Sequence, residues 1–174
     1  MNSKEFLNRV ANSKVDFIEN FFFILRKNKI KYCVIGGLSV NAYAEPVVSL
    51  DMDVVVVSEK LSELLKIIKK HFKVKRFEHS INISAPQSDI RIQIQTDPKY
   101  QQFIKDAKLK SLLGYKLSVA KIEDVLKGKI WAYSDKTRRA SKRQKDLSDI
   151  MRLIEAKKSL FHLLPEQLKK KFIF

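Results

Sequence analysis

The most constraining feature of this sequence is a short apolar run that ends in two adjacent glycines. Residues 32–35 read Tyr-Cys-Val-Ile and are followed directly by Gly36 and Gly37. A short apolar run of this kind is typical of a buried strand, and a glycine pair permits a tight turn. Residues 38–44 then have the composition of a short helix, which should end before Pro46. The sequence therefore predicts a strand, a tight turn and a helix in immediate succession.

A second strand follows and bears two acidic residues. Residues 52–57 are rich in valine, and Asp51 and Asp53 stand two positions apart where this strand begins. Because side chains alternate along a strand, both carboxylates should leave the same face. Adjacent carboxylates repel each other unless a cation compensates them, and Mg²⁺ prefers such hard oxygen ligands. The alternative is structural, with Asp51 capping the turn and Asp53 forming an ion pair.

The remaining pattern predicts helices and strands around this pair. The spacing of apolar residues predicts helices at 4–27 and 59–72, and Asp97-Pro98 should open another through about residue 107. Residues 73–95 predict two or three strands, of which 89–95 alternates most strictly, and 115–119 predicts an edge strand. From about residue 120 the chain is helical in pattern, with interruptions expected at Gly128 and 134–142.

These elements predict an α+β fold in which helices flank a mixed sheet and a helical bundle follows at the C-terminus. We expect residues 1–120 to form the α/β core with an N-terminal helix, and 121–174 to pack on it as one compact unit. The single cysteine, Cys33, excludes a disulfide within the chain and fits a reducing cytoplasm. No apolar run is long enough to span a membrane.

The chain is strongly basic. It has 35 Lys and Arg residues against 19 Asp and Glu, a formal net charge of +16. This excess indicates a polyanionic partner, either a nucleic acid or a nucleotide, although a merely solvated basic surface is the alternative. Residues 136–145 hold six basic residues and no acidic one. We expect this stretch to contact nucleic acid phosphates, through Arg138, Arg139, Lys142 and Arg143.

The glycine turn is a second candidate site for phosphate. Backbone N–H groups at a Gly-Gly turn that enters a helix form an anion-binding nest, so Gly36 and Gly37 are candidate nucleotide-binding residues. Ser39 lies two residues further on, and its hydroxyl could add a contact. The order of strand, glycine turn, helix and acidic strand is much rarer than a glycine pair alone.

Residues 34–57, V-I-G-G-L-S-V-N-A-Y-A-E-P-V-V-S-L-D-M-D-V-V-V-V, resemble the signature of the DNA polymerase β-like nucleotidyltransferase superfamily. Two later segments, L-K-G-K-I-W-A-Y and R-Q-K-D-L-S-D-I-M-R-L, resemble the branch that contains the AbiEii-type toxins. The resemblance covers roughly residues 30–155. It implies a nucleotidyltransferase-like fold, Mg²⁺ (or Mn²⁺), an NTP substrate, and transfer of an NMP to RNA (tRNA) or protein. It also implies a toxin-antitoxin system with a cognate antitoxin.

In that branch a lysine on one helix and an aspartate on the next belong to the active site, and Lys129 and Asp146 match them. Lys129 falls within the apolar stripe of its helix, where a lysine either extends to solvent or meets an anion. A triphosphate would be a suitable anion, so Lys129 is also a candidate nucleotide-binding residue. Asp146 lies at the border of its helix's apolar face, whereas Asp149 should point further out. Asp146 is therefore the better catalytic candidate, although Lys145 and Arg152 could neutralise either aspartate.

The sequence departs from the superfamily in two ways. Many relatives have an arginine four residues before the first aspartate, where this chain has Val47. The superfamily also supplies a third carboxylate from a later strand, but the polar positions of residues 91–95 are Arg91, Gln93 and Gln95. Either Asp89 is the third metal ligand, or the site uses two strand carboxylates and relies on Asp146. A third alternative is an inactive site.

Three functions remain open on the sequence alone. The first is metal-dependent transfer of an NMP from an NTP to an acceptor hydroxyl on RNA or protein. The second is the same chemistry on a small molecule, as in antibiotic nucleotidyltransferases, which the net charge of +16 does not favour. The third is a catalytically degenerate module of the same fold that binds nucleic acid or protein.

Overall fold

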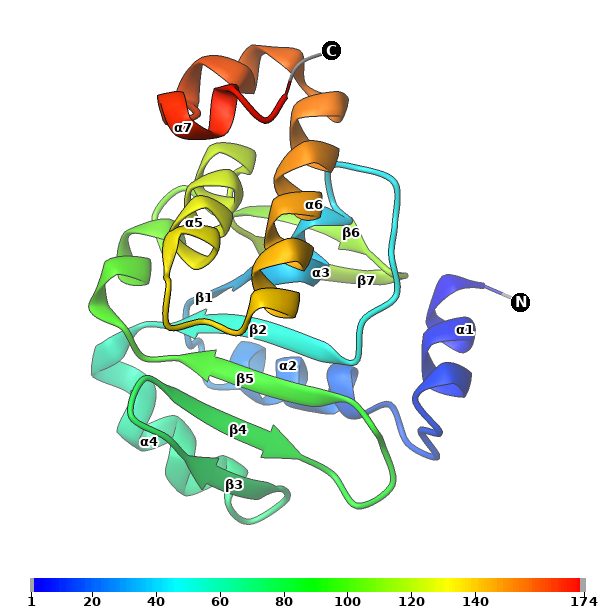
Figure 1. Ribbon diagram of the computed structural model, residues 1–174. Coiled ribbons are helices and arrows are strands. Elements are labelled where there is room, and N and C mark those ends of the chain that lie inside the picture. Colours follow the sequence, from blue (N-terminus) through cyan, green and yellow to red (C-terminus); the bar gives the residue numbers. More distant parts are fainter. Residues whose placement is uncertain (1, 173–174) are drawn as a thin grey trace.

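A computed structural model describes residues 2–172, which contain a seven-stranded mixed sheet (Figure 1). The strand order is β3-β4-β5-β2-β1-β7-β6. Strand β1 runs antiparallel to β2 and parallel to β7, and β2 runs parallel to β5. The bounds are β1 Tyr32–Ile35, β2 Asp51–Val56, β3 Lys73–Arg76, β4 Ser80–Ser84, β5 Arg91–Gln95, β6 Lys108–Leu112 and β7 Tyr115–Val119. A mixed sheet flanked by helices confirms the predicted fold class.

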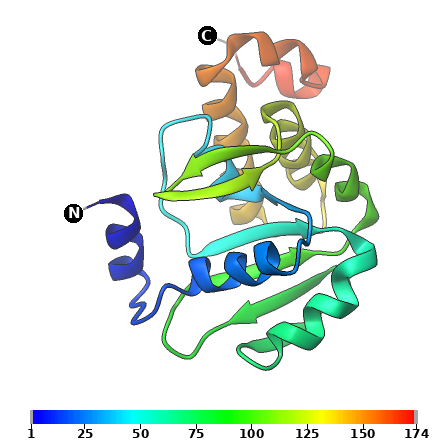
Figure 2. The same cartoon turned by 180° about the vertical axis from the view of Figure 1, so that it is seen from behind.

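Helices cover the two faces of the sheet unequally. Helices α2 and α4 lie on the rear face, whereas α5 and α6 lie in front of the β1–β2 half (Figures 1 and 2). The front of β4 and β3 has no helix over it in these views. The bounds are α1 Ser3–Val10, α2 Phe17–Lys27, α3 Gly36–Val40, α4 Ser58–Ile68, α5 Ile122–Ser134, α6 Ala140–Ala156 and α7 Glu166–Lys169, with 3₁₀ helices η1 Pro98–Ile104 and η2 Lys158–Leu163.

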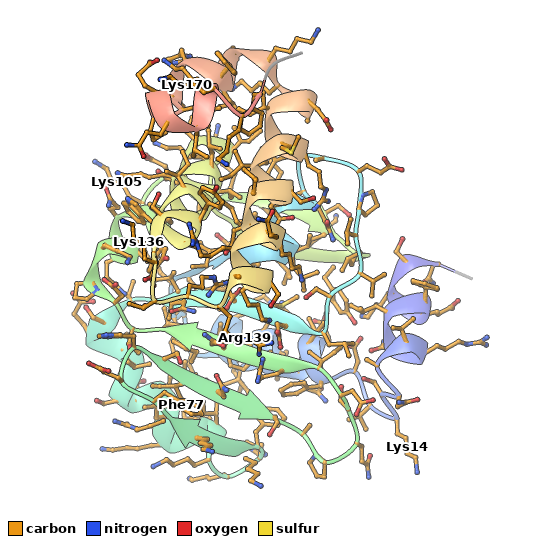
Figure 3. The ribbon with its side chains drawn as sticks, in the orientation of Figure 1. Lys14, Phe77, Lys105, Lys136, Arg139 and Lys170 are labelled. Atoms are coloured by element: carbon orange, nitrogen blue, oxygen red, sulfur yellow. The ribbon has the colours of Figure 1, made fainter. Side chains whose placement is uncertain are left out.

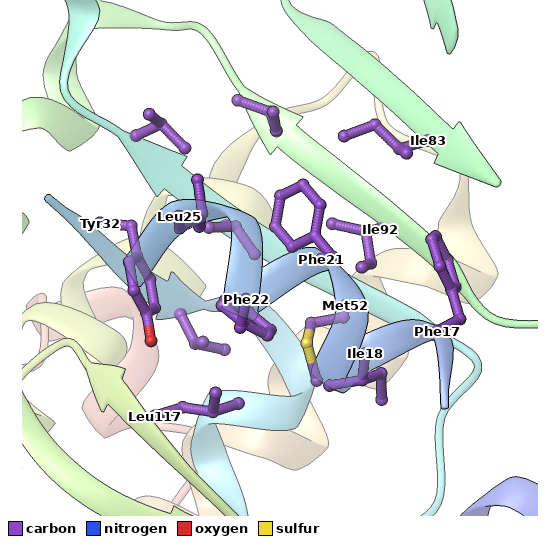
Figure 4. Packing of buried hydrophobic residues seen from close by; sticks show 14 of the residues in the cluster. Phe17, Ile18, Phe21, Phe22, Leu25, Tyr32, Met52, Ile83, Ile92 and Leu117 are labelled. Carbon is purple, nitrogen blue, oxygen red and sulfur yellow. The ribbon is translucent and has the colours of Figure 1, made fainter. Parts of the chain in front are cut away.

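The core divides into one hydrophobic cluster on each face of the sheet. Behind the sheet, the aromatic face of α2 packs Phe21 and Phe22 against strand residues such as Met52 and Ile92 (Figure 4). In front, α5 and α6 pack on the opposite side chains of β1 and β2, among them Cys33 and Val55. Because β1 is buried on both faces, its apolar sequence has no polar alternation.

The N-terminal segment corrects one prediction. The expected helix at 4–27 is two helices, because Asn12 takes a positive φ of 48° and ends the first one. Asparagine tolerates that left-handed conformation better than most residues. Asp16 then caps α2 by accepting a hydrogen bond from the Glu19 backbone N–H at 3.0 Å. Helical spacing of apolar residues continued across the break and concealed it.

Three later elements also differ from the prediction. Strand β7 is not an edge strand, because β6 pairs with its outer side through the tight turn at Leu113 and Gly114. Gly128 lies inside α5 and does not interrupt it; a Cβ there would lie 3.5 Å from Tyr100 and 3.6 Å from Phe103. Its missing side chain therefore permits close packing against η1, which replaces the α-helix expected near residues 97–107. No described helix is long and apolar enough to cross a membrane.

Asp16 connects the N-terminal helices to the sheet, and its removal should lower stability. Its carboxylate caps α2, accepts a hydrogen bond from the Tyr115 hydroxyl at 2.9 Å and lies 2.8 Å from Lys4 Nζ. We expect Asp16→Ala to lower the free energy of unfolding by about 1–3 kcal/mol, measured by urea denaturation. Asp16→Asn keeps the cap and loses only the partly exposed ion pair with Lys4, so it should cost about 0–1 kcal/mol. Equal losses in both variants would contradict a capping role.

Candidate active site

The glycine turn and the acidic strand meet through the pairing of β1 with β2. Ile35 is the cross-strand partner of Asp53, so the next residue, Gly36, lies against the Asp53 side chain. A Cβ on Gly36 would lie 2.1 Å from Asp53 Oδ2, and Gly36 has a positive φ of 72°. Both the backbone conformation and the close approach therefore require glycine at this position. Gly37 follows beside the α5–α6 pair, where its Cβ would lie 3.6 Å from Asp149 Oδ2 and 3.8 Å from Lys129 Nζ.

Asp51 and Asp53 face one pocket of about 270 Å³ between the sheet and helices α5 and α6. Asp51 is 36% exposed, and its Oδ1 accepts a hydrogen bond from Arg91 Nη2 at 2.7 Å. Lys142 Nζ lies 3.9 Å from Asp51 Oδ2. Asp53 is more enclosed, and its Oδ1 is 3.4 Å from Gln95 Nε2, a long hydrogen bond. The structure therefore brings both predicted carboxylates together but balances only the outer one with direct cationic contacts.

Burial perturbs the inner carboxyl group. Loss of solvent raises the pKa of Asp53 above its usual value, and the neighbouring charge of Asp51 raises it further. The charge of Lys129 and the hydrogen bond from Gln95 act in the opposite direction but do not cancel the effect of burial. An ionised Asp53 would gain from an additional cation in the pocket.

Helices α5 and α6 contribute a buried network of charges. Lys129 Nζ lies 2.9 Å from Asp146 Oδ1 and 2.7 Å from Asp149 Oδ2. All three residues are less than a tenth exposed. Arg138 Nε donates to Asp146 Oδ2 at 2.7 Å, and Arg152 Nη1 donates to Asp149 Oδ1 at 2.7 Å. Lys129 and Asp146 thus lie in the same site, as predicted, and each is held by partners of opposite charge.

The expectation that Asp149 points outward is wrong. Asp149 is 3% exposed, because Lys129 and Arg152 neutralise it within the helix interface. Arg152 also donates to Asn41 Oδ1 at 3.0 Å and to the Glu45 carbonyl, which joins α6 to the segment after α3. The apolar pattern of the helix could not reveal a position buried by ion pairing.

Two predicted ligands lie outside the pocket. Ser39 is fully buried, and its hydroxyl donates to the Gly36 carbonyl at 2.7 Å, so it stabilises the turn instead of facing the cavity. Asp89 precedes β5 and accepts a hydrogen bond from Asn12 Nδ2 at 2.6 Å. Gln93, not Asp89, stands across from Asp53. Among the described residues there is no group of three His, Cys, Asp or Glu side chains that could hold a metal ion.

The basic stretch at 136–145 is only partly directed at the pocket. Arg138 and Lys142 line it, together with Lys145. Arg143 Nε instead donates to the Tyr133 carbonyl at 2.8 Å, and its guanidinium lies over the Tyr133 ring. Arg139 is exposed near the lower end of α6 and is not a lining residue (Figure 3). Of the four residues predicted to contact nucleic acid, Arg138 and Lys142 thus face the cavity, whereas Arg139 and Arg143 do not.

The sequence interpretation missed Arg91 as a partner of Asp51. The alternation of the predicted strand placed Arg91 on its polar face. Only the register of β5 against β2 shows that Arg91 lies beside Asp51. Tyr100 of η1 and Asp124 of α5 also line the pocket without having been singled out. No sequence motif marks either residue.

Comparison with known proteins gives the fold. No protein-family model and no curated protein sequence matches the chain. Among solved structures, that of ANT(2'')-Ia in complex with adenylyl-2''-tobramycin has a TM-score of 0.63 at 12% identity, over 90% of this chain and 97% of that one. Lincomycin-bound LnuA, a lincosamide antibiotic adenylyltransferase, has a TM-score of 0.56 at 9% identity, over 82% and 99%.

A nucleotidyltransferase-like protein from Paracoccidioides brasiliensis has a TM-score of 0.54 at 19% identity, over 88% of this chain and 78% of that one. The fold is therefore that of nucleotidyltransferases, which agrees with the superfamily resemblance. At these identities the likeness shows the fold and does not extend to the AbiEii-type branch or to a substrate.

The raised pKa of Asp53 leads to a prediction about stability. The folded protein holds a proton on Asp53 more tightly than the unfolded chain does, so this group favours folding at low pH. Its contribution is lost as the pH rises through the folded-state pKa. We expect the melting temperature of Asp53→Asn, relative to the wild type, to be highest at neutral pH and to lose this advantage on acidification. Thermal denaturation from pH 7.5 downward, without divalent cations, measures the difference.

Asp51→Asn is the matched control, because Asp51 is more exposed and pairs directly with Arg91. Its effect on the melting temperature should not follow the Asp53 pattern. A constant difference between Asp53→Asn and the wild type across this range would contradict the argument.

Proposed function

We propose that this protein transfers an NMP from an NTP to an acceptor hydroxyl with release of pyrophosphate, in a reaction that depends on Mg²⁺ or Mn²⁺. The observation that carries the proposal is the convergence of Asp51, Asp53 and the Gly36-Gly37 turn in one pocket of a nucleotidyltransferase fold. The cations that line the same pocket make it suitable for a triphosphate.

The donor set fits a hard divalent cation. Asp51 and Asp53 supply carboxylate oxygens from one face of β2, and the enclosed Asp53 has no salt-bridge partner among the described residues. A bound cation would neutralise developing charge on the phosphates and the leaving oxygen. Since Asp89 lies elsewhere, the remaining ligands would be phosphate oxygens and water, as is common for Mg²⁺.

The chain's own groups account for nucleotide placement. Gly36 and Gly37 line the pocket beside the carboxylates, and Lys142 and Lys145 would offer positive charge to the phosphates from α6. The acceptor oxygen would form a bond to the α-phosphorus while the bond to the bridging oxygen of the β-phosphate breaks, and a pocket carboxylate would take the hydroxyl proton. Lys129 and Asp146 would act as a coupled pair that fixes the positive charge near Asp53.

The acceptor is proposed to be RNA, with a tRNA end as the form implied by the toxin-branch resemblance; a protein acceptor is the alternative. The net charge of +16 supports a polyanion. The same resemblance supports a role as a cytoplasmic toxin controlled by an antitoxin. Arg138 and Lys142 would meet the acceptor at the mouth of the pocket, with Arg139 and Arg143 further out.

One specific observation supports each of two other functions. ANT(2'')-Ia and LnuA, which act on antibiotics, share the fold and support a small-molecule acceptor. An aminoglycoside is cationic, however, and the pocket lining holds five Lys or Arg residues against four Asp. The position of Asp89 outside the pocket, with Gln93 beside Asp53, supports a catalytically degenerate binding module.

A transfer assay tests the proposal. We expect labelled NTP, Mg²⁺ and total RNA to give labelled RNA with the wild type, and at least a hundredfold less with Asp51→Asn/Asp53→Asn, because metal-based charge stabilisation supplies several kcal/mol. Asp106→Asn, an exposed aspartate paired with Lys121, serves as the matched control and should retain activity.

Each outcome distinguishes among the functions. Label on an added aminoglycoside or lincosamide, and none on RNA, would support a small-molecule acceptor. Label on protein would identify the alternative acceptor. Absence of transfer to any of these, with RNA still bound, would contradict catalysis and support the degenerate module.

A further inference from the structure

A continuous polar surface extends from the two carboxylates across the uncovered half of the sheet. Asp53 stands opposite Gln93, Gln93 opposite Asn82, and Asn82 opposite Lys75. Side chains directly opposite each other on neighbouring strands share a face, so this row starts in the pocket and runs outward to β3. Three strand spacings of about 4.8 Å make it about 14 Å long.

A second row runs parallel to the first. Asp51 stands opposite Arg91, Arg91 opposite Ser84, and Ser84 opposite Lys73. The intervening residues of these strands, among them Ile83 and Ile92, are buried on the rear face. We define the open sheet face as the six residues beyond β2 in these rows: Lys73, Lys75, Asn82, Ser84, Arg91 and Gln93.

The charge of the open sheet face is positive outside the catalytic carboxylates. Strands β3, β4 and β5 contain Lys73, Lys75, Arg76 and Arg91 and no acidic residue. Lys73 and Lys75 are exposed, and no helix lies in front of β3 in Figure 1. Neutral hydrogen-bonding side chains of Gln93, Asn82 and Ser84 lie between these lysines and the pocket.

An exposed aromatic ring completes this surface. Phe77 follows β3 and is 48% exposed, and Lys75 Nζ lies 5.1 Å from its ring centroid (Figure 3). Its backbone N–H donates to the Ser80 carbonyl, which continues the pairing of β3 with β4. A solvent-exposed ring beside lysines, on a polar sheet, is the combination with which proteins hold single-stranded nucleic acid.

We infer that the open sheet face binds a single-stranded RNA acceptor, whose end reaches the carboxylates of β2. Lys73, Lys75 and Arg91 contact its phosphates, Gln93 and Asn82 offer hydrogen bonds to it, and Phe77 stacks on a base. This inference rests on the proposed function for the reacting end of the RNA. Only half of the basic residues at 136–145 line the pocket. The open sheet face would supply additional positive charge for the polyanion.

Fluorescence anisotropy with a labelled single-stranded RNA 12-mer tests the inference on the full chain. We expect Lys73→Glu/Lys75→Glu to weaken binding at least tenfold at low salt and to reduce the slope of log affinity against log salt by about 1.4, since each phosphate contact contributes about 0.7. Phe77→Ala should weaken binding roughly tenfold through loss of stacking.

Lys66→Glu/Lys69→Glu is the matched control. These exposed lysines belong to the α4 region on the rear face, and the substitutions change the net charge equally. The control should lose little affinity and little salt dependence. Circular dichroism and thermal melting confirm folding of each variant, and nucleotide affinity is measured on the same samples by calorimetry with ATP and Mg²⁺.

The inference is overturned if wild-type protein does not bind the RNA, if both double variants lose affinity equally, or if a protein becomes the labelled acceptor. Failure of the proposed function gives a different result. RNA affinity would then still depend on Lys73, Lys75 and Phe77, while transfer and nucleotide binding would be absent in the wild type.

Discussion

The contact between Gly36 and Asp53 is the constraint on which the candidate site depends. The antiparallel register of β1 and β2 aligns Ile35 with Asp53, and the next residue must then turn away in a left-handed conformation. Any side chain at position 36 would occupy the space of the carboxylate. The turn that starts α3 and the carboxylate pair are therefore one structural unit, which explains their close association in the sequence.

The buried charge network places the second half of the site against this unit. Lys129 from α5 holds Asp146 and Asp149 of α6, and Gly37 approaches both Lys129 and Asp149. Breaking a buried ion network by removing one partner is strongly destabilising, so substitutions of Lys129 would combine effects on folding and activity. Asp51 is partly exposed and is a better position at which to test chemistry, because its partners Arg91 and Lys142 lie at the surface.

Local signals predicted much of this arrangement. The valine-rich strand, the glycine turn and the alternation of residues 89–95 led to the correct fold class and to the meeting of Asp51 and Asp53 with the glycine turn. Lys129 and Asp146, which line the same pocket, were indicated by the family resemblance. Contacts between distant segments were not predictable in this way. Asp89 accepts a hydrogen bond from Asn12, which lies in the break between α1 and α2. The sequence pattern did not predict that break, so it could not predict this contact. The prediction that Asp149 points outward was wrong because ion pairs with Lys129 and Arg152 bury this residue. The spacing of apolar residues gives no information about ion pairs.

We propose that the two carboxylates of β2 and a triphosphate together form the metal site. With only Asp51 and Asp53 as acidic ligands in β2, a divalent cation should bind weakly to the protein alone and tightly once the nucleotide supplies oxygens. Electron paramagnetic resonance of free Mn²⁺, titrated with protein in the presence and absence of a non-hydrolysable NTP, measures this directly. We expect Mn²⁺ uptake beyond that of the nucleotide alone, and loss of this additional uptake in Asp51→Asn/Asp53→Asn. Uptake that is the same in both proteins, or no uptake beyond that of the nucleotide, would contradict it.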